Sequence, residues 1–406
     1  MDIKAFIQER REKSRRLEGL ERADLNIWVT TIILCCFGLI MVYSASGYEC
    51  SQNPDYKYDS LYLFKRQAVF MVIGFVCMYA GRFLDYHLLY KIASGIYILG
   101  IICIFLLLTP LGVVNNGACR WLRVGPVTFQ VAEVVKIAVI IFLAFMICRY
   151  SSYLHRTKMT IYLWLAGGIP AVLLFRISND FSSALVVLGI TFSLTFIFTE
   201  TYKIHFITAG GAFAVCAAYL IYLANHLPTQ EKLDQLPFRI GRVAAWLAPE
   251  RYASGQGYQI LQSLYAIGSG GFLGKGLGNS VQKLGTIPEA QNDMIFSIIC
   301  EELGVAGAAL VAGLIAYLLY CFLRVAGHSD LFGSVMVSGI LFHIGIQSII
   351  NIAVNCNWFP NTGLPLPFFS YGGTSIFLLL GEVGLILAIE RFNMIKAIKG
   401  KQKKWS

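Results

Sequence analysis

The sequence predicts an all-α integral membrane protein with ten transmembrane helices, and composition is the first reason. Of the 406 residues, 57% are hydrophobic and 14% are charged, whereas soluble domains carry about 25% charged residues. The mean hydropathy is +0.64. Folded in water, such a chain would expose more apolar surface than a soluble protein tolerates. The same figures exclude a disordered chain, a collagen-like fibre and a small disulfide scaffold.

The second reason is a set of ten apolar segments that approach the roughly 20 residues needed to cross a bilayer. They are residues 27–46, 67–84, 90–109, 131–148, 159–175, 181–199, 204–225, 304–323, 331–355 and 373–390. The first follows a long charged leader, which predicts an uncleaved span although Ser44, Ala45 and Ser46 resemble a cleavage site. We therefore divide the chain into an N-terminal tail (1–26), one polytopic domain (27–390) and a C-terminal tail (391–406).

Basic residues in the two tails give the orientation. The N-terminal tail carries Lys4, Arg10, Arg11, Lys13, Arg15, Arg16 and Arg22. The C-terminal tail carries Arg391, Lys396, Lys399, Lys401, Lys403 and Lys404, with no acidic residue. Because lysine and arginine stay on the cytoplasmic side, both termini are predicted to be cytoplasmic, which requires an even number of spans. The net charge of +10 is thus assigned to the membrane surface rather than to nucleic-acid binding.

This orientation places the unusual motifs on the outer side. The predicted outer loops are 47–66, 110–130, 176–180, 226–303 and 356–372, and the longest of them joins spans 7 and 8. The eleven cysteines lie mostly inside apolar segments, where a thiol behaves as a small apolar side chain. Neither they nor the six histidines have zinc-site spacing, so no metal held by thiolate or imidazole is expected.

The loop before the fourth span contains two arginines and a tryptophan, at Arg120, Arg123 and Trp121. Such residues commonly anchor a chain at the membrane interface. Glu133 and Lys136 then share one face at the start of the span. Ionisable groups at this depth usually face the protein interior. The sequence leaves open whether they form a structural ion pair or a functional one, and predicts that they line a polar cleft.

The loop 226–303 is several times longer than an ordinary connection, and such loops are commonly functional. Six glycines between 268 and 278 resemble a phosphate loop, but no strand precedes them, so they are interpreted as bends at the membrane surface. Asp293 follows Glu289 by four residues and precedes an apolar run. Partial desolvation would raise the pKa of Asp293 toward the range of a general base. A helix cap is the competing interpretation.

Polar residues recur every four positions in the ninth span, at His343, Gln347, Asn351 and Asn355. This stripe on one helix face predicts hydrogen bonding between helices, or else the wall of a hydrated groove. The prolines and glycines of 356–372 predict a rigid re-entrant turn that is buried in protein or lines a cavity. Glu382, inside the tenth span, is a buried carboxylate that could pair with the stripe.

Three long motifs in order resemble the SEDS family (shape, elongation, division and sporulation), and the resemblance extends over about 27–395. The motifs are NGACRW at 116–121 with Gln130, Glu133 and Lys136; GYQILQSLYAIGSGG at 257–271 with GLGNSVQKL, PEA, Asp293 and EELG at 276–304; and PNTGLPLPFFSYGGTS at 360–375. The GLGNSVQK and PEA stretches are more similar to the division and sporulation branch than to the rod-elongation branch. Which of those two roles applies is left open.

The resemblance implies a multi-pass enzyme of the bacterial cytoplasmic membrane that joins lipid II into glycan strands on the outer face, with a class B penicillin-binding transpeptidase as partner. It implies that Asp293 is the essential acidic residue, that Glu133 and Lys136 are the buried polar pair of span 4, and that Arg120 is the motif arginine. Further substrate-binding candidates inside these motifs are Trp121, Gln130, Lys283, Glu289 and Ser370.

The implied reaction is one inverting displacement. The 4-hydroxyl of an acceptor sugar attacks the anomeric carbon of a lipid-linked donor and expels pyrophosphate, with Asp293 as base. Arg120 and Lys136 are the candidates to neutralise the pyrophosphate, with Glu133 orienting Lys136. A divalent cation (Mg or Mn) could assist, but no dedicated ligand cluster is visible.

The chain departs from the family pattern in three places. Gln291 and Asn292 stand where His-Thr is common before the aspartate. Val131 and Ala132 stand where Pro-Ser commonly follows the glutamine, and the segment around Asp180 reads SNDFSSA. Two other functions remain open: a lipid II flippase, which the polar stripe favours and the plain inner loops disfavour, and a non-catalytic scaffold that recruits a transpeptidase.

Overall fold

A computed structural model describes residues 3–115, 118–125, 127–229, 238–285 and 287–402. Asn116 and Gly117 of the NGACRW motif, part of the long outer loop (230–237) and the last four residues of the C-terminal tail lie outside this range. Within it, ten helices are long and apolar enough to cross a membrane. They are α1 (Ile3–Gln52), α2 (Tyr62–Gly81), α3 (His87–Leu106), α4 (Val131–Arg149), α5 (Thr157–Ile177), α6 (Phe181–Phe198), α7 (Tyr202–Asn225), α11 (Ile295–His328), α12 (Leu331–Asn355) and α13 (Gly373–Gln402).

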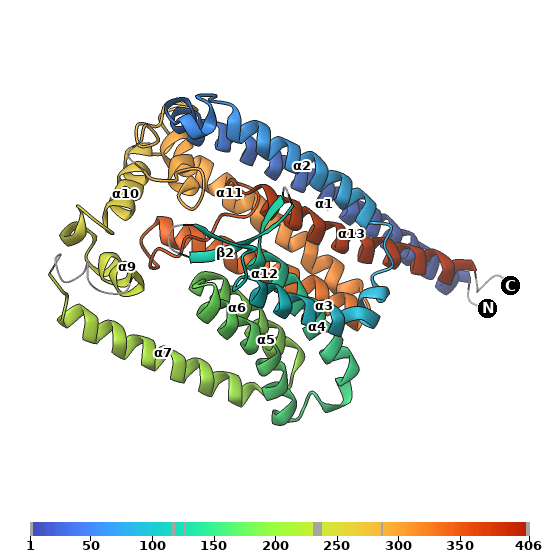
Figure 1. Ribbon diagram of the computed structural model, residues 1–406. Coiled ribbons are helices and arrows are strands. Elements are labelled where there is room, and N and C mark those ends of the chain that lie inside the picture. Colours follow the sequence, from blue (N-terminus) through green and yellow to red (C-terminus); the bar gives the residue numbers. More distant parts are fainter. Residues whose placement is uncertain (1–2, 116–117, 126, 230–237, 286, 403–406) are drawn as a thin grey trace.

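The two ends of the chain emerge at the same end of the bundle (Figure 1). The helices of the long outer loop, α9 (Phe238–Leu247) and α10 (Tyr258–Gly270), lie at the opposite end. Ten candidate spans among the described residues agree with the even number that the basic tails require.

The predicted eighth span differs in its start. It was expected to begin at residue 304, but α11 begins at Ile295 and has a break at Gly304, where φ is 66° and ψ is −164°. The segment 295–303 is therefore a separate short helical stretch in front of the span. Sequence hydropathy missed it because Glu301 and Glu302 interrupt the apolar run, although both are fully buried.

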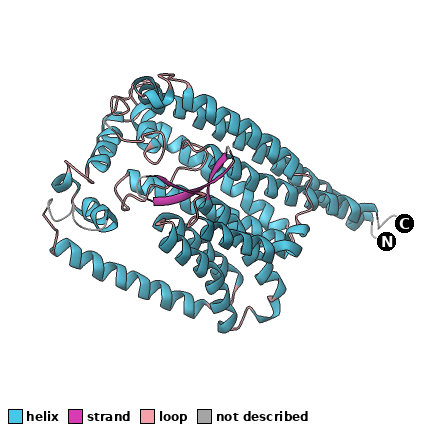
Figure 2. Ribbon diagram, in the orientation of Figure 1, coloured by secondary structure: helices cyan, strands magenta, loops and turns pink. Residues whose placement is uncertain are grey.

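The predicted loop 110–130 contains a three-stranded antiparallel sheet (Figure 2). Its strands are β1 (Gly112–Asn115), β2 (Ala118–Val124) and β3 (Val127–Gln130), in that order. Trp121 faces Gln130 across the β2–β3 pair. Since β3 ends where α4 begins, the sheet places the arginine motif of β2 directly above the start of the fourth span.

The helices differ in how far the rest of the protein covers them. Among the most apolar stretches of the spans, 67% of α4 and 61% of α12 are buried, against 6% of α7. Figure 1 shows α7 apart from the other helices along most of its length. The centre of the bundle is therefore α4, α12 and their neighbours, and α7 is left to the lipid.

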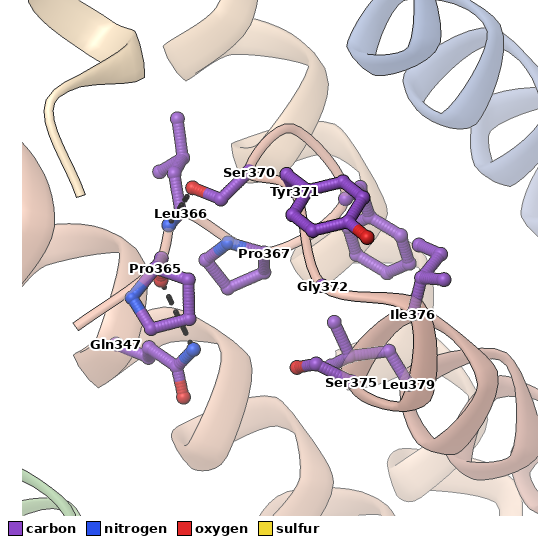
Figure 3. A pocket seen from close by; sticks show the side chains of 11 residues that line it. Gln347, Pro365, Leu366, Pro367, Ser370, Tyr371, Gly372, Ser375, Ile376 and Leu379 are labelled. Carbon is purple, nitrogen blue, oxygen red and sulfur yellow. Dashed lines mark hydrogen bonds between the residues drawn. The ribbon is translucent and has the colours of Figure 1, made fainter. Parts of the chain in front are cut away.

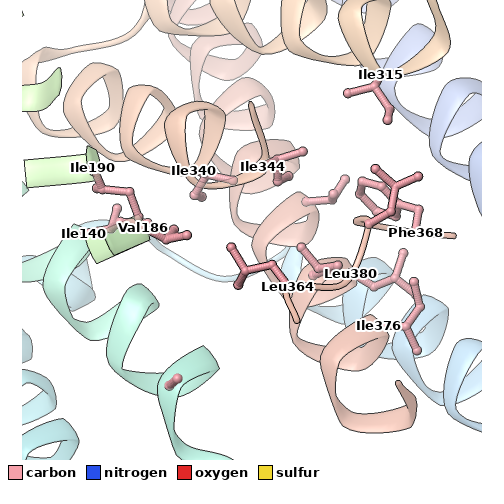
Figure 4. Close-up of a cluster of buried hydrophobic side chains, with 14 of the residues drawn as sticks. Ile140, Val186, Ile190, Ile315, Ile340, Ile344, Leu364, Phe368, Ile376 and Leu380 are labelled. Carbon is pink, nitrogen blue, oxygen red and sulfur yellow. The ribbon is translucent and has the colours of Figure 1, made fainter. Parts of the chain in front are cut away.

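The loop before α13 enters the apolar core. Leu364 and Phe368 of this loop are buried among the side chains of Ile340 and Ile344 on α12 and Leu380 on α13 (Figure 4). A loop at this depth has to satisfy its backbone within the protein. The amides of α12 and the hydroxyl of the loop's own serine supply the required bonds. This confirms the expected re-entrant turn buried in protein.

Two adjacent glycines on α5 give a test of the packing between α5 and α6. A methyl group at Gly167 would lie 2.7 Å from Cβ and 1.9 Å from Oγ1 of Thr191 on α6, whereas one at Gly168 would meet nothing within 4 Å. We expect Gly167→Ala to reduce the free energy of unfolding by about 1–3 kcal/mol, because a β-branched neighbour cannot move aside. Gly168→Ala should be neutral or stabilise by up to about 1 kcal/mol. Unfolding in detergent measures both, and equal stability of the two variants would contradict this helix contact.

Candidate active site

Asp293 lies at the outer end of α11, just before the helix begins at Ile295, and its side chain is partly exposed. Asn351 and Asn355, one turn apart on α12, both donate amide hydrogen bonds to the Asp293 carbonyl oxygen, at 2.8 and 2.9 Å. The polar stripe therefore fixes the backbone of Asp293. The carboxylate does not act as a helix cap, because α11 begins after Met294 without a side-chain cap.

The environment of Asp293 makes its carboxyl group unusually basic, with a pKa raised to about 6. Burial contributes most, and the negative charge of Glu289 adds to it. The positive charge of Arg242 acts in the opposite direction, as does a hydrogen bond of 3.3 Å from Gln259 Nε2 to Asp293 Oδ1. At neutral pH such a group is mostly ionised and still basic enough to accept a proton in a reaction.

Two guanidinium groups approach the same place. Arg242, on α9, is close enough to Asp293 for their charges to attract, and its pKa is lowered chiefly by burial, with the like charge of Arg120 contributing. Arg120, on β2, donates from Nη2 to the Asn179 carbonyl at 3.3 Å. Two cations held near each other in a partly buried place lower their mutual repulsion by binding an anion. The site is therefore a basic carboxylate beside a cationic pair.

The re-entrant loop completes this arrangement through Asn361. The Asn361 carbonyl accepts from Arg242 Nη1 at 3.1 Å, and its amide nitrogen donates to Gln259 Oε1 at 2.8 Å. A methyl group placed on Gly363 would lie 3.9 Å from both Arg242 Nη1 and Asp293 Oδ2. The loop, the long outer loop and α11 thus meet at one point, although they are far apart in the sequence.

Several buried polar atoms around this point have no hydrogen-bond partner among the described residues. They are Arg120 Nε, Gln291 Oε1, Asn292 Oδ1 and Thr362 Oγ1. Native proteins rarely leave such atoms unsatisfied, and a group of them usually marks a place that water or a ligand occupies. Gln291 and Asn292 are the residues that replace the common His-Thr pair, so this departure supplies two amide groups to the site.

Glu133 and Lys136 form an ion pair of 2.8 Å that is enclosed in the bundle. Lys136 also donates to Gln347 Oε1 at 2.8 Å, and its exposed fraction is 0%. The structure therefore shows the structural ion pair, and the expectation that it lines a polar cleft is wrong for this conformation, because α12 closes over the ammonium group. His343 continues the chain to Glu382, with Nδ1 at 2.9 Å from Oε2. This confirms that Glu382 pairs with the stripe.

The remaining candidate residues hold the elements around the site in place. Gln130 Nε2 donates to Asp180 Oδ2 at 3.4 Å, and Asp180 caps α6, so both fix the sheet to the bundle. Trp121 belongs to the same sheet. Lys283 pairs with Glu302 at 2.7 Å and donates to Ser44 at 2.9 Å, which places its ammonium group against α1 and α11 rather than against Asp293.

Ser370 organises the re-entrant turn, since its hydroxyl accepts a hydrogen bond of 2.7 Å from the Leu366 amide. It lines a small cavity between this turn, α12 and α13, together with Gln347, Tyr371 and Ser375 (Figure 3). Gln347 holds the turn in place by donating to the Pro365 carbonyl at 3.0 Å. The structure thus brings Ser370 to the wall next to the site.

Arg242, Gln259 and Asn361 were not singled out from the sequence. Gln259 and Asn361 lie inside motifs of the resemblance, but amide side chains carry no charge that would draw attention to them. Arg242 carries a signal that could have found it. It is one of two arginines in the otherwise apolar helix α9, FRIGRVAAWL, and a cation among apolar residues calls for an anionic partner.

The α12 amides provide a test of how Asp293 is held. We expect Asn351→Ala to leave the Leu364 carbonyl without this donor, at a cost of about 1–3 kcal/mol, and to remove one of the two amide donors to the Asp293 carbonyl. Hydrogen exchange of the 289–296 backbone amides should then accelerate. Ser348→Ala on the same helix is the control, because the Ser348 hydroxyl bonds only within α12, to Ile344. Equal exchange in the two variants would show that Asn351 does not hold the segment.

The chain is similar to known proteins over nearly its whole length. Residues 24–395 match the family FtsW/RodA/SpoVE, described as "Cell cycle protein". Stage V sporulation protein E of Bacillus subtilis (strain 168) is 36% identical, over 91% of this chain and 97% of its own length. The "Probable peptidoglycan glycosyltransferase FtsW" of Trichlorobacter lovleyi is 33% identical, over 95% and 97%.

Two solved structures share the fold. One is a chain from work described as "Structural coordination of polymerization and crosslinking by a peptidoglycan synthase complex", with a TM-score of 0.71, 27% identity and coverage of 90% of this chain and 97% of that one. The other is the rod shape determining protein RodA of Thermus thermophilus, with a TM-score of 0.62, 24% identity and coverage of 90% and 95%. On the match over nearly its whole length, together with relatives above 30% identity, the chain belongs to the FtsW/RodA/SpoVE family of multi-pass membrane proteins.

Proposed function

We propose that this protein is a peptidoglycan glycosyltransferase that joins lipid II units into glycan strands at the outer face of the cytoplasmic membrane. The observation that carries the proposal is the partly buried Asp293 carboxyl group with a pKa of about 6, beside Arg242 and Arg120. The names of its FtsW relatives support the same activity. The similarity to Stage V sporulation protein E and to FtsW places the role in division or sporulation.

In this mechanism Asp293 accepts the proton of the acceptor's 4-hydroxyl as the oxygen attacks the anomeric carbon of the donor. The new glycosidic bond forms as the bond from that carbon to the pyrophosphate breaks, and the electron pair leaves with the pyrophosphate. One displacement inverts the configuration, so an α-linked donor gives a β-linked strand. A single carboxylate is sufficient, because no covalent intermediate forms on the enzyme.

The leaving pyrophosphate gains negative charge, and Arg120 and Arg242 are placed to stabilise it. Lys136 was the other candidate, but its ammonium is enclosed by Glu133 and Gln347, so we assign it to holding α4 against α12. Among the described residues, no three His, Cys, Asp or Glu side chains gather at metal-binding distance. We propose that the arginines supply part of this charge, and a divalent cation (Mg or Mn) carried by the pyrophosphate remains a further candidate.

The proposed partner is a class B penicillin-binding transpeptidase. The structural relative at 27% identity comes from a complex in which polymerization and crosslinking are coordinated, so an association of this kind fits the fold. The second candidate function is lipid II translocation. It is favoured by the chain of buried polar groups from Glu133 to Glu382, but these groups satisfy one another and are fully enclosed.

The first experiment is polymerisation of purified lipid II by the purified protein, with and without a class B transpeptidase whose own active site is inactivated. We expect Asp293→Asn to lower the rate at least about 100-fold, which is the low end for loss of a general base. The Asn side chain keeps the shape of the site, so the variant should retain its thermal stability. Near-normal strand formation by Asp293→Asn would rule out its role as base. If wild type makes no strands either, translocation in vesicles separates a flippase from a scaffold.

The pH dependence of the rate tests the charges around Asp293. Because the base must be ionised, kcat/KM should rise with pH through about 6 and then level off. Arg242→Gln removes a charge that lowers the pKa of Asp293, so the rise should move to higher pH. Glu289→Gln removes a charge that raises it, so the rise should move to lower pH. Shifts in the same direction for both variants would contradict this assignment.

A further inference from the structure

Three tyrosines meet at the outer end of the bundle, beside Asp293. Tyr56 lies in the short helical turn Pro54–Tyr56 between α1 and α2, Tyr62 begins α2, and Tyr371 lies in the re-entrant loop. The rings of Tyr56 and Tyr62 are 5.5 Å apart with an angle of 37° between their planes. All three side chains are half-buried. We call these three residues the tyrosine surface.

Backbone hydrogen bonds fix Tyr371 relative to the proposed base. The Tyr371 amide donates to the carbonyl of Gln291 at 2.8 Å, two residues before Asp293. Gln67, buried on α2, donates to the carbonyl of the residue before Tyr371 at 3.4 Å and accepts from the amide of the residue after it at 3.2 Å. Hydrogen bonds to α2 and to the segment that carries Asp293 therefore fix the backbone at Tyr371, from which its ring projects.

Electrostatic contacts show that the tyrosine surface is continuous with the site. Burial raises the pKa of the Tyr56 phenol, and the charges of Glu49 and Glu289 add to this rise. Glu289 also raises the pKa of Asp293. One exposed carboxylate thus acts on Asp293 and on Tyr56, and with the backbone bond from Tyr371 to Gln291 this places the tyrosine surface next to the site.

An arginine adds a charged group to this surface. Burial raises the pKa of Tyr371, while Arg66 lowers it by its charge and by a hydrogen bond to the phenol. Arg66 itself is exposed, so the same guanidinium can also bind a carboxylate of a ligand. A half-buried set of aromatic rings with hydroxyl groups and a cation suits a ligand that has apolar faces, many hydroxyl and amide groups, and acidic substituents.

We propose that the tyrosine surface is a glycan subsite that binds the N-acetylated amino sugars next to the two being joined, with Arg66 binding a carboxylate of their peptide substituents. The apolar faces of pyranose rings pack on aromatic side chains, and the phenol groups supply hydrogen bonds at the ring edges. This assignment rests on the proposed polymerase function, because only a polymeric product extends beyond the reacting pair. The subsite keeps the strand aligned with Asp293 from one addition to the next.

Aromatic residues at the membrane interface also serve as anchors, and the test has to separate the two roles. We compare wild type with the double variant Tyr56→Ala/Tyr62→Ala and with Tyr62→Leu, which keeps apolar volume but removes the ring. Tyr58→Ala is the matched control, because Tyr58 lies in the same connection and is 64% exposed. The measurements are strand length from lipid II and binding of soluble, lipid-free peptidoglycan oligosaccharides by saturation-transfer NMR.

We expect the double variant to make strands at least about threefold shorter and to bind the oligosaccharides about tenfold more weakly, which corresponds to about 1.4 kcal/mol. Tyr62→Leu should show the same direction and Tyr58→Ala should match wild type. If the two tyrosine-surface variants match Tyr58→Ala in both measurements, the subsite is refuted and the polymerase proposal is unaffected. If wild type binds the oligosaccharides through these residues but makes no strands, the polymerase proposal fails and the binding site remains.

Discussion

The hydrogen bonds from the α12 amides to two stretches of irregular backbone are the constraint on which the outer half of the protein depends. The amide of Asn351 connects the two stretches, because it donates to the carbonyls of both Asp293 and Leu364, at 2.8 Å each. Within a membrane protein, non-helical backbone at this depth persists only if the protein itself satisfies it. One helix face therefore holds both the segment that bears the carboxylate and the loop that faces it. The α12 helix therefore determines the position of the Asp293 segment relative to the re-entrant loop.

The contrast between Asp293 and the glutamates of α11 supports the choice of Asp293 as the proposed base. Glu301 accepts from Lys275 Nζ at 2.7 Å, from the Ser280 hydroxyl and from two backbone amides, and Glu302 accepts from Lys283 and Ser44. Those contacts hold both glutamates in a structural role. Asp293 has an arginine at charge-interaction distance and one long hydrogen bond. A carboxylate that the protein satisfies incompletely retains its affinity for a proton.

Sequence patterns predicted the ten spans, the even topology and the region of the site, because apolar length and basic tails are local properties. They left open whether Glu382 pairs with the stripe, and the structure shows that it does. They did not predict the sheet over 112–130, since short strands inside a polar loop carry little periodicity. They placed Lys136 and Lys283 at the substrate, whereas both are paired with glutamates in the structure. The charge of a lysine does not determine which of several carboxylates it will pair with. Arg242 was missed because its neighbours in space come from three distant segments.

Asp293 lies beside Arg242 of α9 and Gln259 of α10, and these helices lie at the end of the bundle opposite the termini, which has a thermodynamic consequence. With the basic tails in the cytoplasm, as their charge predicts, the proposed site would face a compartment that contains no nucleoside triphosphates. No step at such a site can draw on ATP, so the free energy for each new bond has to arrive inside the donor, stored in the linkage between sugar and pyrophosphate. Under the proposed function, each addition therefore consumes one activated donor. The enzyme then needs only to select the bond that is formed with the free energy of the donor.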